Sequence, residues 1–309
     1  MKLIKPKFWD NKNISIFAFL LLPFTLFFNF IVIIKKFIET ENKFHIPIIC
    51  VGNIYMGGTG KTPLSIEIYK ILKTAGYRPA FIKKKNKNYF DESLMLKKIG
   101  ILFEEKLRKN AIYKAIKNKN NIGIMDDGFQ DFTIRKNINI LCFNEKQWIG
   151  NGLNIPSGPL RENLNSLKKV NFIFLKGKKN LLIEKQIKKI NNKISVYYFN
   201  YSPKNISKFK KKKIIAFVGI GEPDNFFNIL KKNKINLIEK IVYPDHYYYK
   251  KKEIDGLIER ANKKKATLIT TQKDFMRLNP NHKKKVLCFD VKTKIIKKNV
   301  FKKKLKELL

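Results

Sequence analysis

The stretch from Pro47 to Gly76 constrains the fold more than any other part of this sequence. The apolar run Pro47–Val51 leads into a glycine-rich segment, and a helical pattern of apolar residues follows until Gly76. A buried strand, a glycine loop and a helix in this order are typical of phosphate-binding loops, which lie at the carboxyl edge of parallel sheets. The pattern predicts an α/β fold with a P-loop NTPase-like, mostly parallel sheet covered by helices.

The glycine-rich segment supplies the groups that hold phosphate in such loops. Its glycines let backbone N–H groups close around phosphate oxygens, Lys61 reaches the β and γ phosphates, and Thr62 offers a hydroxyl to Mg²⁺. Tyr55 departs from the usual G-x-x-x-x-G-K-T pattern, because it occupies the first glycine position. A glycine turn followed by a chance Lys-Thr pair is the alternative interpretation. The predicted nucleotide-binding residues are Tyr55, Met56, Gly57, Gly58, Thr59, Gly60, Lys61 and Thr62.

A second apolar run, Ile122–Met125, ends in the adjacent carboxylates Asp126 and Asp127. P-loop enzymes place the acid that organises Mg²⁺ at the carboxyl end of a strand. An Asp-Asp-Gly sequence by itself is commonly only a turn. Because the phosphate loop lies upstream, the pattern favours a metal site made by Thr62, Asp126 and Asp127.

The amino-terminal region carries an uncharged apolar run, Ile14–Ile34, with lysines on both sides. At a rise of about 1.5 Å per residue, a helix of this length could cross the ~30 Å hydrocarbon layer of a bilayer. Pro23 is expected to kink such a helix, and Asn29 is polar, so a helix in the membrane interface is the alternative to a full span. A buried core helix and a signal peptide are further alternatives. The pattern predicts a membrane-anchor helix within residues 1–40.

The charge of the chain is strongly positive. Sixty-six Lys and Arg residues stand against 24 Asp and Glu residues, which gives a formal net charge of +42. Such a charge attracts polyanions and anionic membrane surfaces. The lysines occur in short runs spread through the sequence, which is typical of solvated loops and helix faces, so no nucleic-acid partner is expected.

Apolar runs alternate with helical stretches after Phe44, as in a βαβ series. The Lys-rich stretch Lys204–Lys213 interrupts this series and predicts a division into a P-loop domain, 41–205, and a smaller α/β domain, 206–309. The expected strands are Pro47–Val51, Ala80–Ile82, Ile101–Phe103, Ile122–Met125, Ile138–Phe143, Phe172–Leu175 and Val196–Phe199, then Ile214–Gly219, Lys240–Tyr243, Thr267–Thr271 and Val286–Phe289.

Taken together, the motifs resemble the tetraacyldisaccharide 4'-kinases, also called lipid A 4'-kinases. The matching segments, in order, are Val51–Asn53, Gly57–Pro63, Asp126–Gln130, Gly158–Glu162, Gly219–Pro223, Pro244–His246 and Thr270–Asp274. The resemblance implies ATP and Mg²⁺ as co-reactants and transfer of the γ-phosphate to the 4'-hydroxyl of a tetraacyldisaccharide 1-phosphate, in lipid A and lipopolysaccharide biosynthesis. It also implies a smaller carboxy-terminal domain that closes the active-site cleft, and contact with inner-membrane lipids at the cytoplasmic face.

The same resemblance assigns roles to residues outside the phosphate loop. It implies that Asp91 is the general base, that His246 orients this base, and that Arg161 and Glu162 lie near phosphates or substrate. A carboxylate held by an imidazole could accept the proton of the sugar hydroxyl. From the residues alone, a helix N-cap is the favoured interpretation of Asp91. The alternative for His246 is a hydrogen-bonded residue in an aromatic patch with Tyr247–Tyr249, and the alternative for Arg161 is a surface salt bridge.

The chain departs from the family pattern at Lys83–Tyr89, which replaces a longer segment containing arginine and glycine. The lysines of this segment are expected to act as point charges near the lipid phosphate. A membrane-associated, partitioning-type P-loop ATPase is the alternative function, and it predicts no role for Asp91 or His246. A nucleic-acid-binding protein would explain the charge but not the apolar run or the phosphate motifs.

Overall fold

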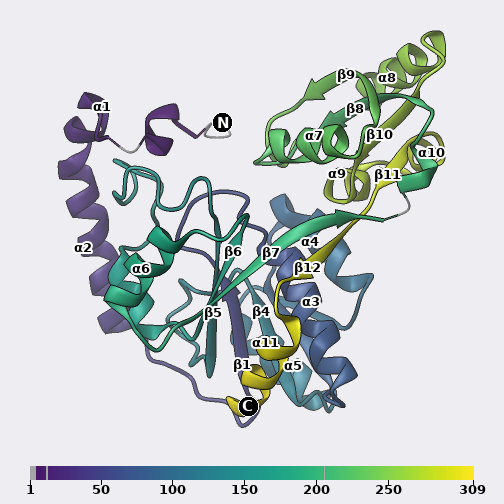
Figure 1. Ribbon diagram of the computed structural model, residues 1–309. Coiled ribbons are helices and arrows are strands. Elements are labelled where there is room, and N and C mark those ends of the chain that lie inside the picture. The colour runs from purple at the N-terminus through teal and green to yellow at the C-terminus, as the bar shows by residue number, and fades with distance from the viewer. Residues whose placement is uncertain (1–4, 12, 205) are drawn as a thin grey trace. The chain divides into compact units, whose positions relative to one another are not determined.

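A computed structural model describes residues 5–11, 13–204 and 206–309. It divides into two compact units (Figure 1). The first unit comprises Met1–Lys85, Gly100–Asn200 and Lys294–Leu309, and the second comprises Asn86–Ile99 and Tyr201–Thr293. The division predicted near residue 205 stays a prediction, and Asn205 and Lys12 lie outside the described residues.

The first unit is built on an eight-stranded sheet in the order β12-β7-β6-β5-β1-β4-β2-β3. The strands from β7 to β3 pair in parallel. All residues of the central strand β1 are buried, which explains its continuous apolar sequence, since parallel strands are covered on both faces. The strands are β1 Ile48–Gly52, β2 Pro79–Lys84, β3 Leu102–Glu105, β4 Ile122–Asp126, β5 Ile138–Asn144, β6 Phe172–Lys176, β7 Ser195–Pro203 and β12 Val291–Ile295, and the last two each have residues in both units.

Helices cover this sheet. Helix α3 packs against β1, β2 and β4, and α5 packs against β2 and β3. The ring of Phe301 in α11 packs edge-on against Phe172 and Phe174 of β6. The helices of this unit are α1 Ile16–Leu20, α2 Leu22–Ile38, α3 Lys61–Thr74, α5 Arg108–Lys117, α6 Leu181–Ile190 and α11 Lys298–Glu307, with short 3₁₀ helices η1 Lys7–Asp10 and η3 Leu164–Lys169.

The second unit has a four-stranded parallel sheet in the order β11-β10-β8-β9. Strand β8 alternates its side chains between two apolar cores, with Ile214 and Ala216 in one and Ile215 and Phe217 in the other. Its elements are β8 Lys213–Val218, β9 Asn236–Val242, β10 Thr267–Thr271, β11 Leu287–Phe289, α4 Phe90–Lys97, α7 Pro223–Lys232, α8 Lys251–Lys263, α9 Gln272–Arg277, α10 Pro280–Lys285, η2 Lys87–Tyr89 and η4 Ile206–Lys208.

Each strand expected from the sequence overlaps an observed strand, so the predicted α/β architecture with a smaller second sheet is confirmed. Strand β12 was not expected. Its sequence, Val291 to Ile295, alternates apolar residues with Lys292 and Lys294, which resembles the lysine-rich loops elsewhere in the chain. Its place beside β7 depends on a strand far away in the sequence.

The amino-terminal apolar run forms two helices rather than the single kinked helix that was predicted. Helix α1 ends before Leu21, and α2 begins after it. Pro23 lies in the first turn of α2, where its missing N–H has no intrahelical partner to lose, so it starts a helix instead of kinking one. Among the described residues, no helix combines the length and the apolar character needed to cross a membrane.

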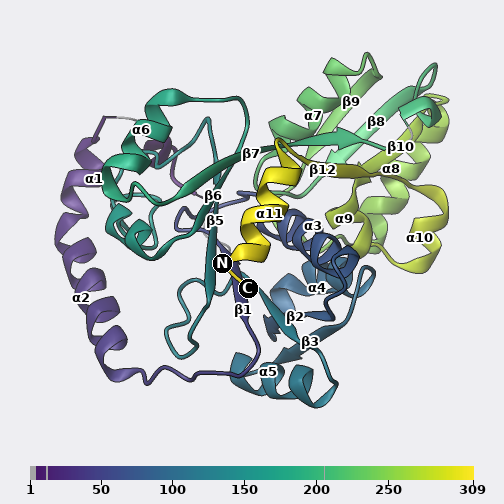
Figure 2. The same cartoon turned by 60° about the horizontal axis from the view of Figure 1, so that its bottom comes forward.

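Helix α2 turns its polar residues toward the first unit. Thr25 is buried and donates to Ser157 Oγ at 2.7 Å, and Asn29 accepts from Asn154 at 2.6 Å. Its large apolar side chains are exposed instead, the opposite of a helix that covers a soluble core. With α1 it forms an apolar arm on the outer side of this unit (Figures 1 and 2), whose exposed side chains include Phe17, Phe19, Phe24, Leu26, Phe27, Phe30 and Phe37.

Candidate active site

The phosphate loop has the predicted order of strand, loop and helix. Strand β1 ends at Gly52, and α3 begins at Lys61 with Gly60 as its N-cap. Gly57 and Gly60 have φ angles of +146° and +91°, in the region that side chains with a Cβ rarely adopt. These two positions therefore require glycine, and they give the loop its curvature.

Hydrogen bonds hold the first half of the loop. The N–H of Met56 donates to Pro159 O at 2.8 Å, and the N–H of Arg161 donates to Ile54 O at 2.7 Å. The buried side-chain amide of Asn53 donates to the carbonyl of Tyr55. The Gly158–Glu162 motif thus lies directly beside the loop, which explains why the two motifs occur together.

Asp126 is fully buried at the end of β4, paired in register with Val51 of β1. Its Oδ2 accepts from Thr62 Oγ1 at 2.9 Å and from Lys83 Nζ at 3.1 Å, and its Oδ1 accepts from Ser65 Oγ at 2.9 Å. The structure therefore brings together Thr62 and Asp126, two of the three residues predicted to hold the metal.

The interpretation of the lysine runs as solvated is wrong for Lys83. Its side chain is 6% exposed and forms the buried ion pair with Asp126. The residue belongs to β2, which lies beside β4, so its side chain reaches the Asp126 carboxylate instead of solvent. Its neighbour Lys84 is exposed, as predicted.

Asp127 brings two predicted cationic residues together. Its Oδ1 lies 3.6 Å from Lys61 Nζ and 3.3 Å from Arg161 Nη1. Its backbone is left-handed, with a φ of +55°, which directs the chain into the following Gly128 turn. Arg161 uses one nitrogen in this contact and is not bidentate.

Glu162 is buried and links the apolar arm to the loop. Its Oε2 accepts from Lys36 of α2 and its Oε1 accepts from Gln130 Nε2, both at 3.1 Å. Gln130 Nε2 also donates to the carbonyl of Asn53 at 3.1 Å. Glu162 therefore positions residues beside the phosphate loop.

Asp91 and His246 meet inside the second unit. Asp91 is fully buried in the first turn of α4, whose N-cap is Tyr89, so the N-cap interpretation of Asp91 is wrong. His246 Nδ1 lies 3.5 Å from Asp91 Oδ1. This Oδ1 lacks a hydrogen-bond partner of ordinary geometry among the described residues.

The second oxygen of Asp91 is held by Arg277. The Nε of Arg277 donates to Oδ2 at 3.0 Å, and Nη2 donates to the same oxygen. Arg277 is in turn bonded to Asp274 Oδ1 at 3.0 Å and to the carbonyl of Gly219 at 2.9 Å. One carboxylate oxygen is therefore fixed, while the other faces His246.

Charge around Asp91 favours its ionised form. Burial by itself raises the pKa of Asp91, but the contact with His246 and the positive charges of Lys273 and Arg277 outweigh burial. They hold the pKa of the carboxyl well below its ordinary value. Asp91 is therefore a carboxylate at neutral pH.

The tautomer of His246 follows from its neighbours. Lys273 Nζ lies 2.9 Å from His246 Nε2, and an ammonium group only donates, so Nε2 accepts and the proton of the neutral ring is assigned to Nδ1. The Nδ1 atom that carries this proton lies 3.5 Å from Asp91 Oδ1 and 3.3 Å from Arg277 Nη2, and in this tautomer it cannot accept from Arg277. The ring also packs edge-on against Tyr89, at 4.5 Å between centroids. The aromatic partner is thus Tyr89, from a different segment than the predicted Tyr247–Tyr249.

Comparisons with known proteins agree on one family. The family model described as tetraacyldisaccharide-1-P 4'-kinase matches residues 17–309. The chain is 46% identical to the tetraacyldisaccharide 4'-kinase of Pelagibacter ubique over 289 residues, covering 93% of this chain and 92% of the relative. It is 32% identical to that of Rickettsia canadensis over 330 residues, covering 99% and 97%. The chain belongs to the tetraacyldisaccharide 4'-kinase family.

A solved structure has a similar fold. The crystal structure titled as the "apo" form of LpxK from Aquifex aeolicus in complex with ATP superposes with a TM-score of 0.69, at 22% identity, covering 94% of this chain and 99% of that one. As a family member, the chain is a tetraacyldisaccharide 4'-kinase of lipid A biosynthesis.

The residues of this 4'-kinase fit a magnesium ion at the loop. Thr62 and Asp126 provide a hydroxyl and a carboxylate oxygen, the hard ligands that Mg²⁺ prefers. Within the described part of the chain, no cluster of three or more His, Cys, Asp or Glu residues could hold a metal alone.

Sequence reasoning missed Ser65, Lys83 and Arg277. Ser65 and Lys83 were missed because nothing in their local sequence indicates that they face Asp126. Arg277 lies about one helical turn after the Thr270–Asp274 family motif. The motif therefore indicated this region of the chain, but it did not indicate that Arg277 pairs with Asp91.

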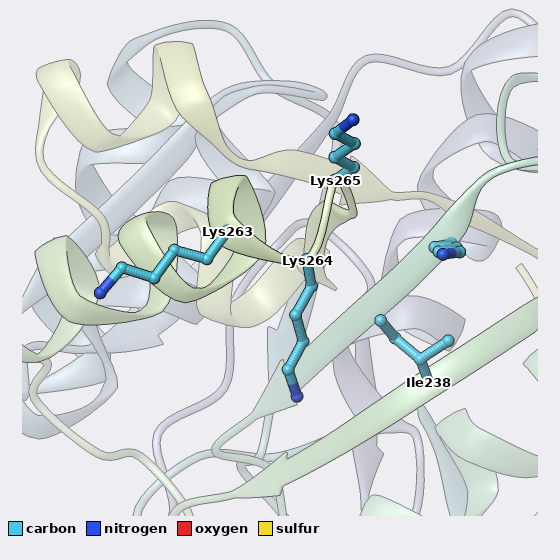
Figure 3. Close-up of a pocket in the computed structure, with 5 residues that line it drawn as sticks. Ile238, Lys263, Lys264 and Lys265 are labelled. Carbon is cyan, nitrogen blue, oxygen red and sulfur yellow. The ribbon is translucent and has the colours of Figure 1, made fainter.

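A lysine-lined hollow in the second unit is not part of this site. It is lined by Lys213, Ile238, Lys263, Lys264 and Lys265. Figure 3 shows Lys263, Lys264 and Lys265 pointing away from one another, and Lys264 Nζ is paired with Glu239 at 2.8 Å. These ammonium groups do not converge on a common anion.

Proposed function

We propose that this 4'-kinase family member transfers the γ-phosphoryl group of ATP to the 4'-hydroxyl of a tetraacyldisaccharide 1-phosphate and forms lipid IVA. The observation that carries the nucleotide side is the loop with Lys61 at the start of α3 and Thr62 bonded to Asp126. Strand β1 positions this loop beside β4, which carries the acid. Such loops bind nucleotide phosphates through backbone N–H groups and a lysine.

Within the loop, each side chain has a distinct task. Lys61 contacts the β and γ phosphates, and Thr62 and Asp126 hold Mg²⁺, which supplies positive charge to the phosphates when bound. The Thr59 hydroxyl is buried without a hydrogen-bond partner among the described residues, so it is available to donate to a phosphate oxygen. Arg161 and Asp127 lie at the same edge, where Arg161 can exchange its carboxylate partner for a phosphate oxygen.

Asp91 activates the acceptor. Its Oδ1 accepts the proton of the 4'-hydroxyl, the freed oxygen forms a bond to the γ-phosphorus, and the bond from that phosphorus to the bridging oxygen of ADP breaks. Arg277 keeps Oδ2 in place, and His246 orients the carboxylate. The low pKa of Asp91 suits a step in which the proton moves late, as the phosphoryl group transfers.

Membrane association follows from the apolar arm. A helix whose exposed side carries many Phe, Leu and Ile side chains is stable at a lipid interface and costly in water. The net charge of +42 adds attraction to anionic lipids. We place the enzyme at the cytoplasmic face of the inner membrane, where the arm keeps it beside its lipid substrate.

The test is a phosphoryl-transfer assay with radiolabelled ATP, Mg²⁺ and the disaccharide lipid in detergent. Wild type is compared with Asp91→Asn and with Asp224→Asn, a matched control because Asp224 is exposed in the first turn of another helix of the second unit. Labelled lipid is expected with wild type and Asp224→Asn, with a loss of at least about 100-fold for Asp91→Asn. No labelled lipid from wild type would overturn the function, and full activity of Asp91→Asn would overturn the base.

A further inference from the structure

Tyr55 occupies the position where the usual phosphate-loop pattern has a glycine, and its side chain is 1% exposed. Its ring lies beside Gly57: a Cβ added to Gly57 would be 3.5 Å from Cε1 of Tyr55. Because Gly57 has a left-handed backbone, the ring packs against the part of the loop with the most unusual conformation. A large side chain therefore supports the loop at a position that is a glycine in the usual G-x-x-x-x-G-K-T pattern.

The hydroxyl of Tyr55 is held by two residues of the amino-terminal segment. Lys5 Nζ donates to Tyr55 Oη at 2.7 Å, and Tyr55 Oη donates to Asp10 Oδ1. Lys5 and Asp10 are themselves paired at 2.6 Å. The three groups contact one another, and the buried hydroxyl donates to a charged acceptor and accepts from a charged donor.

Trp9 anchors the same segment independently. Its side chain is buried, its Nε1 donates to Pro156 O at 3.0 Å, and its carbonyl accepts from the N–H of Asn151 at 3.0 Å. Gly150 permits this approach, because a Cβ there would lie 2.1 Å from the Trp9 carbonyl oxygen. The segment is therefore seated on the polypeptide that leads into the Gly158–Glu162 motif.

The segment also leads directly into the apolar arm. The ring of Phe8 lies 6.4 Å from that of Phe17, an exposed residue of α1. The same segment therefore contacts both the apolar arm, through Phe8, and Tyr55, through Lys5 and Asp10.

We propose that Tyr55 is a positioning residue of the phosphate loop, and that Lys5 and Asp10 couple it to the amino-terminal segment, so that ATP affinity depends on the docking of this segment. The proposal rests on ATP binding by the loop. Its ligand is ATP itself, and Tyr55 acts on it through Gly57 and the loop amides. Loss of the tyrosine hydroxyl leaves the ring free to shift and the loop free to sample other conformations.

The test measures the Kd for ATP with Mg²⁺ by calorimetry on the full-length protein in detergent micelles. The variants are Tyr55→Phe, which keeps the ring, Asp10→Asn, and the double variant. Lys7→Met is the matched control, because Lys7 is an exposed cation in the same 3₁₀ helix as Asp10. Circular dichroism confirms that each variant is folded.

We expect Tyr55→Phe and Asp10→Asn each to raise the Kd for ATP about tenfold, equivalent to about 1.4 kcal/mol. The double variant should be no worse than either single variant, since both changes remove one coupled contact. Turnover at saturating ATP and the KM for the lipid should stay within about twofold of wild type, because the acceptor residues are unchanged.

Three other outcomes have distinct meanings. If wild type binds ATP and both single variants bind it as well as Lys7→Met does, the inference is wrong and the proposed function stands. If the effects of the two changes add, the coupling between Tyr55 and Asp10 is wrong. If wild type fails to bind ATP at all, the proposed function fails and the inference fails with it.

Discussion

Arg277 donates two N–H groups to the same oxygen of Asp91, with Nε at 3.0 Å, and both side chains are buried. This contact decides which oxygen of Asp91 remains available to a substrate. Together with His246 and Lys273, Arg277 keeps the pKa of this buried carboxyl below its ordinary value, so Asp91 stays ionised in the interior of the second unit. The predictions below begin with this pair and move to the phosphate loop and the apolar arm.

Replacing Arg277 by Met should destabilise the protein by about 3–5 kcal/mol, because Asp91 and Asp274 lose their shared buried counter-ion. Urea denaturation monitored by fluorescence measures this loss. Lys251→Met is the control, since Lys251 is an exposed cation of the same unit. An unfolding free energy equal to that of the control would show that the ion pairs contribute nothing.

Arg277→Lys should keep much of the stability but lower turnover by about tenfold or more, since an ammonium group cannot present two fixed donors to one carboxylate oxygen. Steady-state kinetics with both substrates measures the change. The KM for ATP should remain near the wild-type value. A change confined to the KM for ATP would contradict a role for Arg277 in positioning Asp91.

The pH dependence of stability provides a separate test of Asp91. Its pKa in the folded protein lies below the ordinary value of 3.8. Ionised Asp91 therefore stabilises the fold above that value, and the contribution is lost as the pH falls through the folded pKa. The difference in unfolding free energy between wild type and Asp91→Asn should be constant from about pH 7 to pH 5 and shrink below about pH 4. A difference that grows on acidification would mean that the pKa of Asp91 is raised.

Lys83→Met should destabilise the first unit by about 3–5 kcal/mol and impair phosphoryl transfer, because it leaves Asp126 charged and buried without its ammonium partner. Lys84→Met removes an adjacent but exposed lysine of the same strand and should have little effect. Thermal unfolding and the transfer assay measure the two consequences. If Lys83→Met and Lys84→Met show the same thermal unfolding and the same transfer activity, Lys83 behaves as a solvated lysine.

The two sides of α2 should respond differently to substitution. Phe27→Ser, on the exposed side, should weaken partition into vesicles containing anionic lipid about tenfold or more, since burying one large apolar side chain contributes about 1.5–3 kcal/mol. Thr25→Val, on the buried side, should leave partition unchanged but cost about 1–3 kcal/mol of stability through the unpaired Ser157 and Asn154 groups. Vesicle sedimentation measures the partition, and urea denaturation measures the stability. Loss of vesicle binding in Thr25→Val but not in Phe27→Ser would show that the lipid-binding side of α2 is the one that carries Thr25.

The parallel architecture and the phosphate loop were predictable because their determinants are local. The apolar run before Gly52, the glycines at positions 57 and 60, and the apolar face of the following helix lie within one continuous stretch. Asp126 was predictable by the same reasoning, since parallel strands present their carboxyl ends at one edge of the sheet. The apolar run Ile14–Ile34 indicated helix, but the break at Leu21 and the docking side of α2 depend on contacts with residues 154–157.

The sequence by itself determined the order of strands and helices, the glycine positions of the loop and the family to which the chain is similar. Tertiary structure alone decided the partners of the charged groups. Asp91 and Arg277 are 186 positions apart, and Tyr55 and Asp10 are 45 apart. Local propensity carries no information about such pairs, because only burial makes an unpaired charge or hydroxyl costly enough to select a partner. In a chain with 66 Lys and Arg residues, burial is what separates Lys83 from the solvated lysines around it.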